Sequence, residues 1–144
     1  MKKLLGIEVD LDIFDDSLAV LWGDKDQLGQ YLKDKQFTLH LRTIDDLESG
    51  FVDGMCFSPG EMEDKSFIWI GKDLKNYSVV CHELMHGILS ITHKRNLFCS
   101  DTPGTGEQEL ECYLVGYVMN KVLGTPKKTW LEWNGTKWVK QKGV

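Results

Sequence analysis

The stretch from Val79 to Leu89 constrains this chain more than any other part of the sequence. Its apolar residues recur three and four positions apart, which is the spacing of a helix that packs one face into a core. His82, Glu83 and His86 interrupt this pattern, and side chains of this kind are costly to bury without a metal or other partners. We therefore expect a core-packed helix whose polar residues form a site.

The spacing of these three residues favours metal chemistry. Residues four apart lie on one face of a helix, so His82 and His86 present two imidazoles to a common point. Imidazole nitrogen binds zinc at about 2.0–2.1 Å, and zinc lowers the pKa of a bound water to about 7. Glu83 lies one position from His82 and can take the proton of that water as it attacks a carbonyl. We expect His82 and His86 to bind Zn²⁺ and Glu83 to be the catalytic base.

A catalytic zinc usually has three protein ligands, so a third ligand is expected from another element. The next predicted helix opens with Glu107, Glu109 and Glu111, although acids in a first turn also suit the positive end of the helix dipole. Glu109 shares a helix face with Cys112 and Gly116, two small residues that would allow a close approach to the first helix. We place Glu109 first, Glu111 as the alternative because its face carries core-like apolar residues, and Glu107 third.

The remaining segments predict strands before the two long helices and a hairpin after them. This order indicates an α+β fold, and the length of 144 residues indicates one domain, 1–144. The expected elements are a hairpin over Leu4–Trp22, a short helix capped by Asp24, strands over Thr38–Ile44, Phe51–Phe57 and Ser66–Gly71, a helix from Asp73 or Asn76 to about His93, a helix from about Glu107 to Leu123, and a hairpin over Trp130–Lys140 that turns at Asn134–Gly135.

Composition narrows the partners and the compartment. The net charge of −5 gives no general attraction to nucleic acid, and no run approaches the ~18 apolar residues of a membrane span. Cys56, Cys81, Cys99 and Cys112 form no CxxC pair, and the apolar N-terminal run is soon broken by acids, unlike an export signal. We expect reduced thiols, with Cys81 and Cys112 packed inside helices, in a cytoplasmic protein.

The motif and its spacing resemble a known class. HELMH followed by Glu109 and the small Cys112 resembles the gluzincin metallopeptidases, whose third zinc ligand is that glutamate. The stretch from Glu109 to Tyr117 is also similar to small HExxH proteins of bacteriophages and prophages, and to the Glu-x-Glu-Ala pattern of the ImmA/IrrE family, which fits Glu109 or Glu111. The resemblance covers residues 66 to 123. It implies a zincin-like fold with a mixed or antiparallel sheet and two long helices that carry the metal site. It also implies that the strand before the metal helix, Phe67–Ile70, is an edge strand that pairs with an extended substrate, whereas the all-apolar character of this run favours a central strand.

Other residues have weaker functional interpretations. His93 returns to the face of His82 and can orient substrate or an oxyanion, but a position near the helix end, where its charge favours the dipole, explains it more simply. Tyr113 can hydrogen-bond an oxyanion, but core packing explains it more simply. Basic residues and tryptophans alternate in the C-terminal hairpin, a pattern that can bind nucleic acid. We expect these tryptophans to pack in the core, and expect no nucleic-acid partner.

Three hypotheses follow. The first is a zinc peptidase that acts on a peptide or protein. The second is a zinc-stabilised protein with a peptidase fold that binds a host or phage partner without catalysis, as the resemblance to phage proteins suggests. The third is a DNA-associated protease recruited by the Lys/Trp hairpin. The substrate, native metal and oligomeric state do not follow from the sequence.

Overall fold

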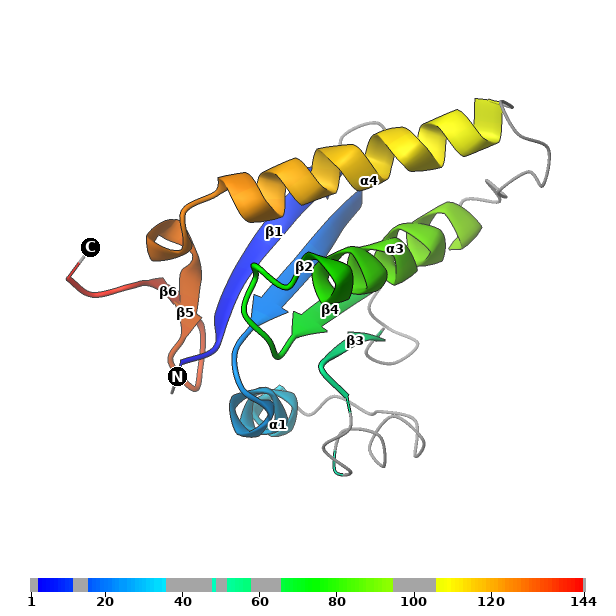
Figure 1. Cartoon of the computed structure of the whole chain (residues 1–144). Helices are drawn as coiled ribbons and strands as arrows, with labels where there is room; N and C mark the ends of the chain where they lie inside the picture. Colours follow the sequence, from blue (N-terminus) through cyan, green and yellow to red (C-terminus); the bar gives the residue numbers. More distant parts are fainter. Residues whose placement is uncertain are drawn as a thin grey trace.

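The structure is a computed structural model that describes residues 3–11, 16–35, 48, 52–57, 66–94 and 106–143 (Figure 1). Within these residues the chain forms an α+β fold with a mixed six-stranded sheet and three α-helices. In chain order the elements are β1 (Leu5–Leu11), β2 (Asp16–Trp22), α1 (Lys25–Asp34), β3 (Gly54–Phe57), β4 (Ser66–Ile70), α3 (Tyr77–Lys94), α4 (Gly106–Gly124), the 3-10 turn η2 (Lys127–Thr129), β5 (Leu131–Trp133) and β6 (Trp138–Lys140).

The sheet has the strand order β3-β4-β2-β1-β5-β6. Strands β2 and β4 are parallel, with Val20 opposite Ile68, and the other neighbouring pairs are antiparallel. All five residues of β4 are buried, as a continuous apolar run predicts for a strand covered on both faces. Because β4 lies between β3 and β2, it is a central strand, and β3 and β6 are the two end strands of the described sheet.

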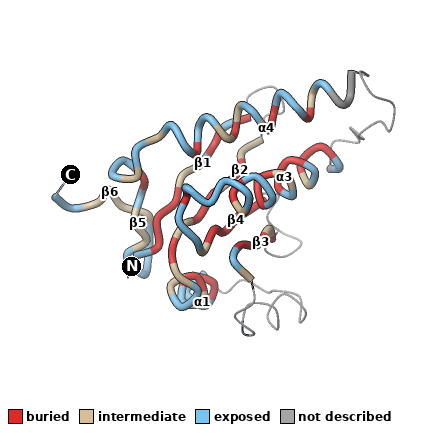
Figure 2. The backbone as a smooth tube through the Cα atoms, in the orientation of Figure 1, coloured by how far each residue is buried: buried red, intermediate tan, exposed pale blue. Residues whose placement is uncertain are grey.

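Helices cover both faces of this sheet (Figure 1). One core cluster joins α3 and α4 to alternate residues of β1, β2 and β4, including Val9, Val20 and Ile68. The second cluster lies on the opposite face and joins the strands to Leu28 and Tyr31 of α1. Figure 2 shows the central strands and the inward sides of the helices buried, whereas the outer side of α4 is exposed. The molecule therefore has three layers, with the sheet in the middle.

Local sequence signals account for the ends of several elements. The Asp24 side chain accepts a hydrogen bond from the Gln27 backbone N–H at 2.9 Å, which caps α1 as predicted. The C-terminal hairpin turns at Asn134–Gly135, where Gly135 has φ of +96° and the Asn134 side chain accepts from the backbone N–H groups of Thr136 and Lys137. These two predictions are confirmed.

The predicted order of elements is confirmed where the chain is described. The predicted strand over Thr38–Ile44 lies outside the described residues. No helix in the described part of the chain combines the length and apolar character that crossing a membrane requires.

Candidate metal centre

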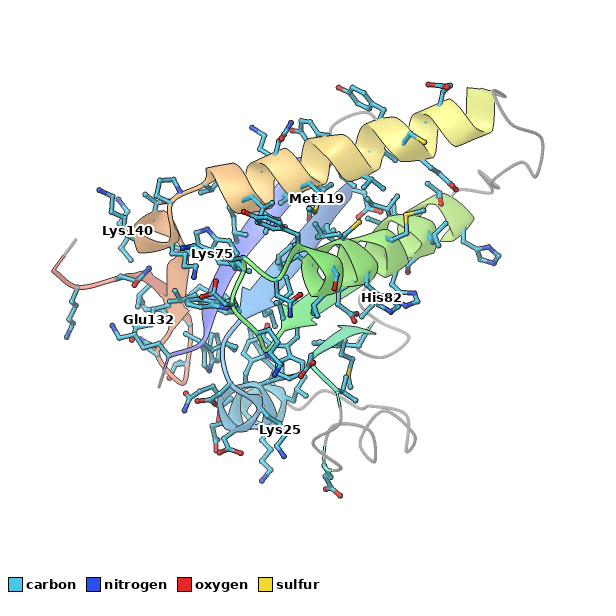
Figure 3. All side chains as sticks on the ribbon, viewed as in Figure 1. Lys25, Lys75, His82, Met119, Glu132 and Lys140 are labelled. Atoms are coloured by element: carbon cyan, nitrogen blue, oxygen red, sulfur yellow. The ribbon has the colours of Figure 1, made fainter. Side chains whose placement is uncertain are left out.

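Helix α3 carries the HELMH motif and separates its residues by burial. Four apolar residues spaced by four, four and three positions face the core and are fully buried, namely Val80, Leu84, Ile88 and Ile91. The helix begins where the Asn76 side chain and carbonyl accept from the Val79 and Val80 backbone N–H groups. His82 and His86 lie on the opposite, exposed side, and Figure 3 shows His82 projecting outward from α3. The core-facing residues thus fix the helix and leave the imidazoles accessible.

The two imidazoles converge. The Nε2 atoms of His82 and His86 are 3.1 Å apart, and the ring centroids are 4.7 Å apart with the planes at 80°. Two nitrogens bound to a tetrahedral zinc at about 2.0–2.1 Å are about 3.3–3.4 Å from each other. The observed separation needs an adjustment of only a few tenths of an ångström to meet that geometry. It also suits a direct hydrogen bond between two neutral rings, so the pair is satisfied with or without an ion.

Glu83 lies beside this pair, although its environment differs. It is 8% exposed, and its Oε1 is 4.0 Å from Nε2 of His82. Burial raises the pKa of the Glu83 carboxyl, and the nearby His82 and His86 imidazoles act in the opposite direction. A carboxylate with a raised pKa is a stronger base, which is the property that a proton acceptor in hydrolysis requires.

The acids of α4 occupy two different faces. Glu109 is exposed, together with Cys112 and Gly116, and a Cβ at Gly116 would meet nothing within 4 Å. The prediction that this face packs closely on the first helix is therefore wrong. The buried face of α4 consists of Leu114, Val118 and Val122. Burying these larger apolar side chains releases more free energy than burying Cys112 or Gly116 would. The side chain of Glu107 lies outside the described residues.

Glu111 shares the buried face of α4. It is 4% exposed, and its Oε1 has no hydrogen-bond partner among the described residues. An unpartnered buried carboxylate oxygen is costly and is the kind of atom that an ion or a water satisfies. The unpartnered oxygen therefore supports Glu111 as the alternative ligand. The observation in favour of Glu109 is that it is exposed, as His82 and His86 are.

A third donor is not gathered with the histidines in the described part of the chain. Within those residues no group of three His, Cys, Asp or Glu side chains lies close enough to hold a metal ion. In Figure 3 the labelled His82 projects from one side of α3 while α4 runs along the other. The structure therefore brings together His82, Glu83 and His86 and leaves Glu109 and Glu111 apart from them.

His93 and Tyr113 do not join this group. His93 is exposed near the end of α3, seven residues beyond His86, which corresponds to about 10 Å along the helix axis. Tyr113 is 64% exposed on α4, where its ring stacks with that of Tyr117 at a centroid distance of 6.3 Å. Their assignment to substrate or oxyanion binding stays a prediction.

Of the tryptophans in the C-terminal hairpin, Trp130 is buried in the core, as predicted, whereas Trp133 and Trp138 are half-buried against the second core cluster. Trp130 is 1% exposed and belongs to the core under α3 and α4. Trp133 and Trp138 contact Tyr31 of α1 with ring centroids 5.0 and 5.5 Å apart, and the Lys35 ammonium lies 5.0 Å from the Trp133 ring centroid. These rings attach the hairpin to α1, which leaves fewer aromatic faces for stacking with bases.

The described cysteines, Cys56, Cys81 and Cys112, form no disulfide with one another. Cys56 is half-buried on β3, whereas Cys81 and Cys112 are exposed, so the prediction that the two helical thiols pack inside is wrong. Cys81 lies next to the buried face of α3 and not on it. Cys112 is exposed because α4 turns Leu114 toward the core. Cys99 lies outside the described residues.

The sequence did not predict the close contact between Glu83 and Gly54 of the sheet. Gly54 opens β3, and a Cβ at that position would be 2.6 Å from Cγ of Glu83. A glycine in a predicted strand is the available signal, because it often marks a close approach by another group.

No known protein family, curated protein sequence or solved structure gives a significant match to this chain.

Proposed function

We propose that this protein is a zinc-dependent metallohydrolase, and specifically a peptidase. His82 and His86 serve as zinc ligands and Glu83 serves as the general base. The observation that carries the proposal is the convergence of the two imidazole Nε2 atoms at 3.1 Å, with the buried Glu83 carboxylate 4.0 Å from one of them. Two nitrogen ligands and an adjacent base are part of the arrangement that metal-assisted hydrolysis needs, and a catalytic zinc usually takes a third protein ligand.

The resemblance to gluzincins implies a third ligand from the first turns of α4, and we keep it in this proposal. Binding there requires these turns to come closer to the two imidazoles than the described structure places them. Glu109 remains the first candidate because it is exposed, as the two imidazoles are, and the resemblance to gluzincins implies this position. Glu111 is the alternative because its buried Oε1 has no partner among the described residues. The two candidates differ in one measurable respect. Replacing the true ligand lowers zinc content, whereas replacing the other acid leaves it unchanged.

Each residue of the proposed site has a separate task. When bound, zinc supplies Lewis acidity that activates water and polarises a carbonyl. The Glu83 carboxylate accepts the proton of the attacking water and passes it to the leaving amine. Burial raises the pKa of Glu83, which strengthens it as a base. A neutral imidazole has one nitrogen with a lone pair and one that carries a hydrogen. His82 and His86 would each bind metal through the first nitrogen and could donate a hydrogen bond through the second.

The position of β3 supports a peptide as the substrate. This strand is one of the two end strands of the described sheet, and Gly54 in it lies against Glu83. An extended peptide that adds to a strand edge gains main-chain hydrogen bonds, and beside β3 its carbonyls would run past the base. The polar, accessible side of α3 lies next to that edge and suits a chain that enters from solvent.

The test compares the purified protein with Glu83→Gln, which keeps the size of the side chain and removes the base. We expect both proteins to contain about one zinc per chain, and only the unsubstituted protein to cleave fluorescently labelled casein or members of a peptide library. Equal cleavage by both proteins would refute the role of Glu83. If Glu83→Gln retains the full biological effect of the protein in cells, the binding hypothesis replaces the catalytic one.

A further inference from the structure

The first residue of β3, Gly54, is in contact with the side chain of Glu83. A Cβ built on Gly54 would lie 2.6 Å from Cγ and 3.0 Å from Cδ of Glu83, and 3.0 Å from the Trp69 carbonyl oxygen. Real Cβ atoms essentially never approach another atom more closely than 3.0 Å. The carboxylate arm of Glu83 therefore occupies the space that any side chain at position 54 would need.

The strand cannot easily move away from Glu83. Gly54 pairs with Ile70 of β4, and the preceding carbonyl of Asp53 accepts a hydrogen bond of 2.8 Å from the Gly71 backbone N–H. The Asp53 carboxylate also lies 3.3 Å from the Lys72 ammonium, although both side chains are half-exposed and this ion pair adds little. Gly71 and Lys72 belong to the connection from β4 to α3, so one short segment ties the strand to the helix.

The helix is equally restrained on its side. Leu84, the next residue after Glu83, is fully buried, and Gly87 on the following turn lies against Ile68 and Leu18. A shift of α3 away from β3 would therefore disturb the core. A side chain at position 54 is most easily accommodated by turning the Glu83 side chain out of its place, which moves the carboxylate relative to His82.

We propose that Gly54 is a positioning residue for Glu83: the absence of a side chain there lets the carboxylate lie beside the two imidazoles. The inference rests on the proposed function, in which Glu83 is the general base. Displacement of a reacting group by about 1 Å can lower a rate by up to a hundredfold, so the added methyl group acts on the chemical step more than on metal or substrate binding.

The kinetic test uses Gly54→Ala with Gly6→Ala as the matched control. A Cβ at Gly6 would lie 2.8 and 2.9 Å from two ring atoms of Trp138, so the crowding is similar but involves the hairpin. With labelled casein as the probe, we expect Gly54→Ala to keep about one zinc per chain and a KM within twofold, and to lower kcat by roughly tenfold or more. Gly6→Ala should leave kcat unchanged. Equal losses of kcat in the two variants would overturn the proposal.

A second test needs no substrate. Thermal unfolding of the metal-free protein is compared for Gly54→Ala, Glu83→Ala and the double variant. Glu83→Ala removes Cγ and Cδ, the two Glu83 atoms closest to an added Cβ at position 54. We therefore expect Gly54→Ala to lower Tm by much less in that background. The same Tm loss in both backgrounds would show that the contact does not exist. If the Tm loss from Gly54→Ala depends on Glu83 but no cleavage does, the contact is real and the catalytic role of Glu83 and the positioning role of Gly54 are refuted.

Discussion

The close packing of α3 on the sheet can be tested at Gly87, the residue directly after His86. A Cβ at Gly87 would lie 2.7 Å from Cδ1 of Ile68 and 2.9 Å from Cδ1 of Leu18, and both of these residues are 0% exposed. Overpacking of this kind costs about 1–3 kcal/mol, and the lower half applies here because the nearest atoms are ends of side chains that can turn. Against this, alanine is favoured over glycine in a helix by about 1 kcal/mol.

The matched control is Gly116→Ala on α4, because that position has the same helix propensity gain and no atom within 4 Å of an added Cβ. We expect Gly116→Ala to raise the free energy of unfolding by about 1 kcal/mol and Gly87→Ala to leave it unchanged or lower it by up to about 1 kcal/mol. Urea denaturation of the metal-free proteins at 25 °C, with equal m values, measures the difference. If Gly87→Ala stabilises the protein as much as Gly116→Ala does, α3 does not lie this close to the sheet.

Two further predictions concern carboxylates outside α3. The Trp133 indole N–H donates to Asp34 at 3.0 Å and, with a smaller contribution from Gln30, lowers the pKa of Asp34; Trp133→Phe should raise that pKa in an NMR titration. Because the pKa of Asp34 is lower in the folded protein, the contact stabilises the fold above the ordinary pKa of an aspartate, and this stabilisation is lost as pH falls through the folded pKa. Trp133→Phe should therefore weaken the dependence of the free energy of unfolding on pH in that range. With Glu109 as the ligand, Glu111→Leu should keep zinc and stabilise the fold by about 1–3 kcal/mol in urea denaturation, whereas loss of zinc would assign Glu111 instead.

Elements with strong local signals could be predicted from the sequence. The apolar spacing of α3 determines which residues are buried, and helix geometry alone then brings His82 and His86 together. The hairpin turn at Gly135 follows from a short dipeptide signal, because an asparagine followed by a glycine readily adopts the positive φ that such a turn needs. In each case the residues that determine the structure lie within a few positions of one another.

Features that depend on distant parts of the chain could not be predicted in the same way. The apolar run of β4 indicates a strand covered on both faces, but it does not identify β3 and β2 as its neighbours. The contact between Gly54 and Glu83 joins an end strand to a helix that is far along the chain. A glycine at the start of a strand suggests a close neighbour without naming it.

The face of α4 that is buried shows how core packing of large apolar residues can outweigh close packing of small ones. Small residues at Cys112 and Gly116 suggest a close helix contact, and apolar residues on the other face suggest core packing. In the structure the larger apolar residues, such as Leu114 and Val118, occupy the core, because burying them releases more free energy than a close approach of small residues. This orientation of α4 exposes Glu109 and buries Glu111, so it bears directly on the choice of the third ligand.

The most direct test of the zinc site is the metal content of the purified protein by mass spectrometry, with His82→Ala and His86→Ala as comparison variants. We expect about one zinc per chain in the unsubstituted protein and a loss of zinc in each variant, with the apolar face of α3 and the fold intact by circular dichroism. A protein that retains full zinc without either imidazole, or that binds no zinc at all while folded, would contradict the account.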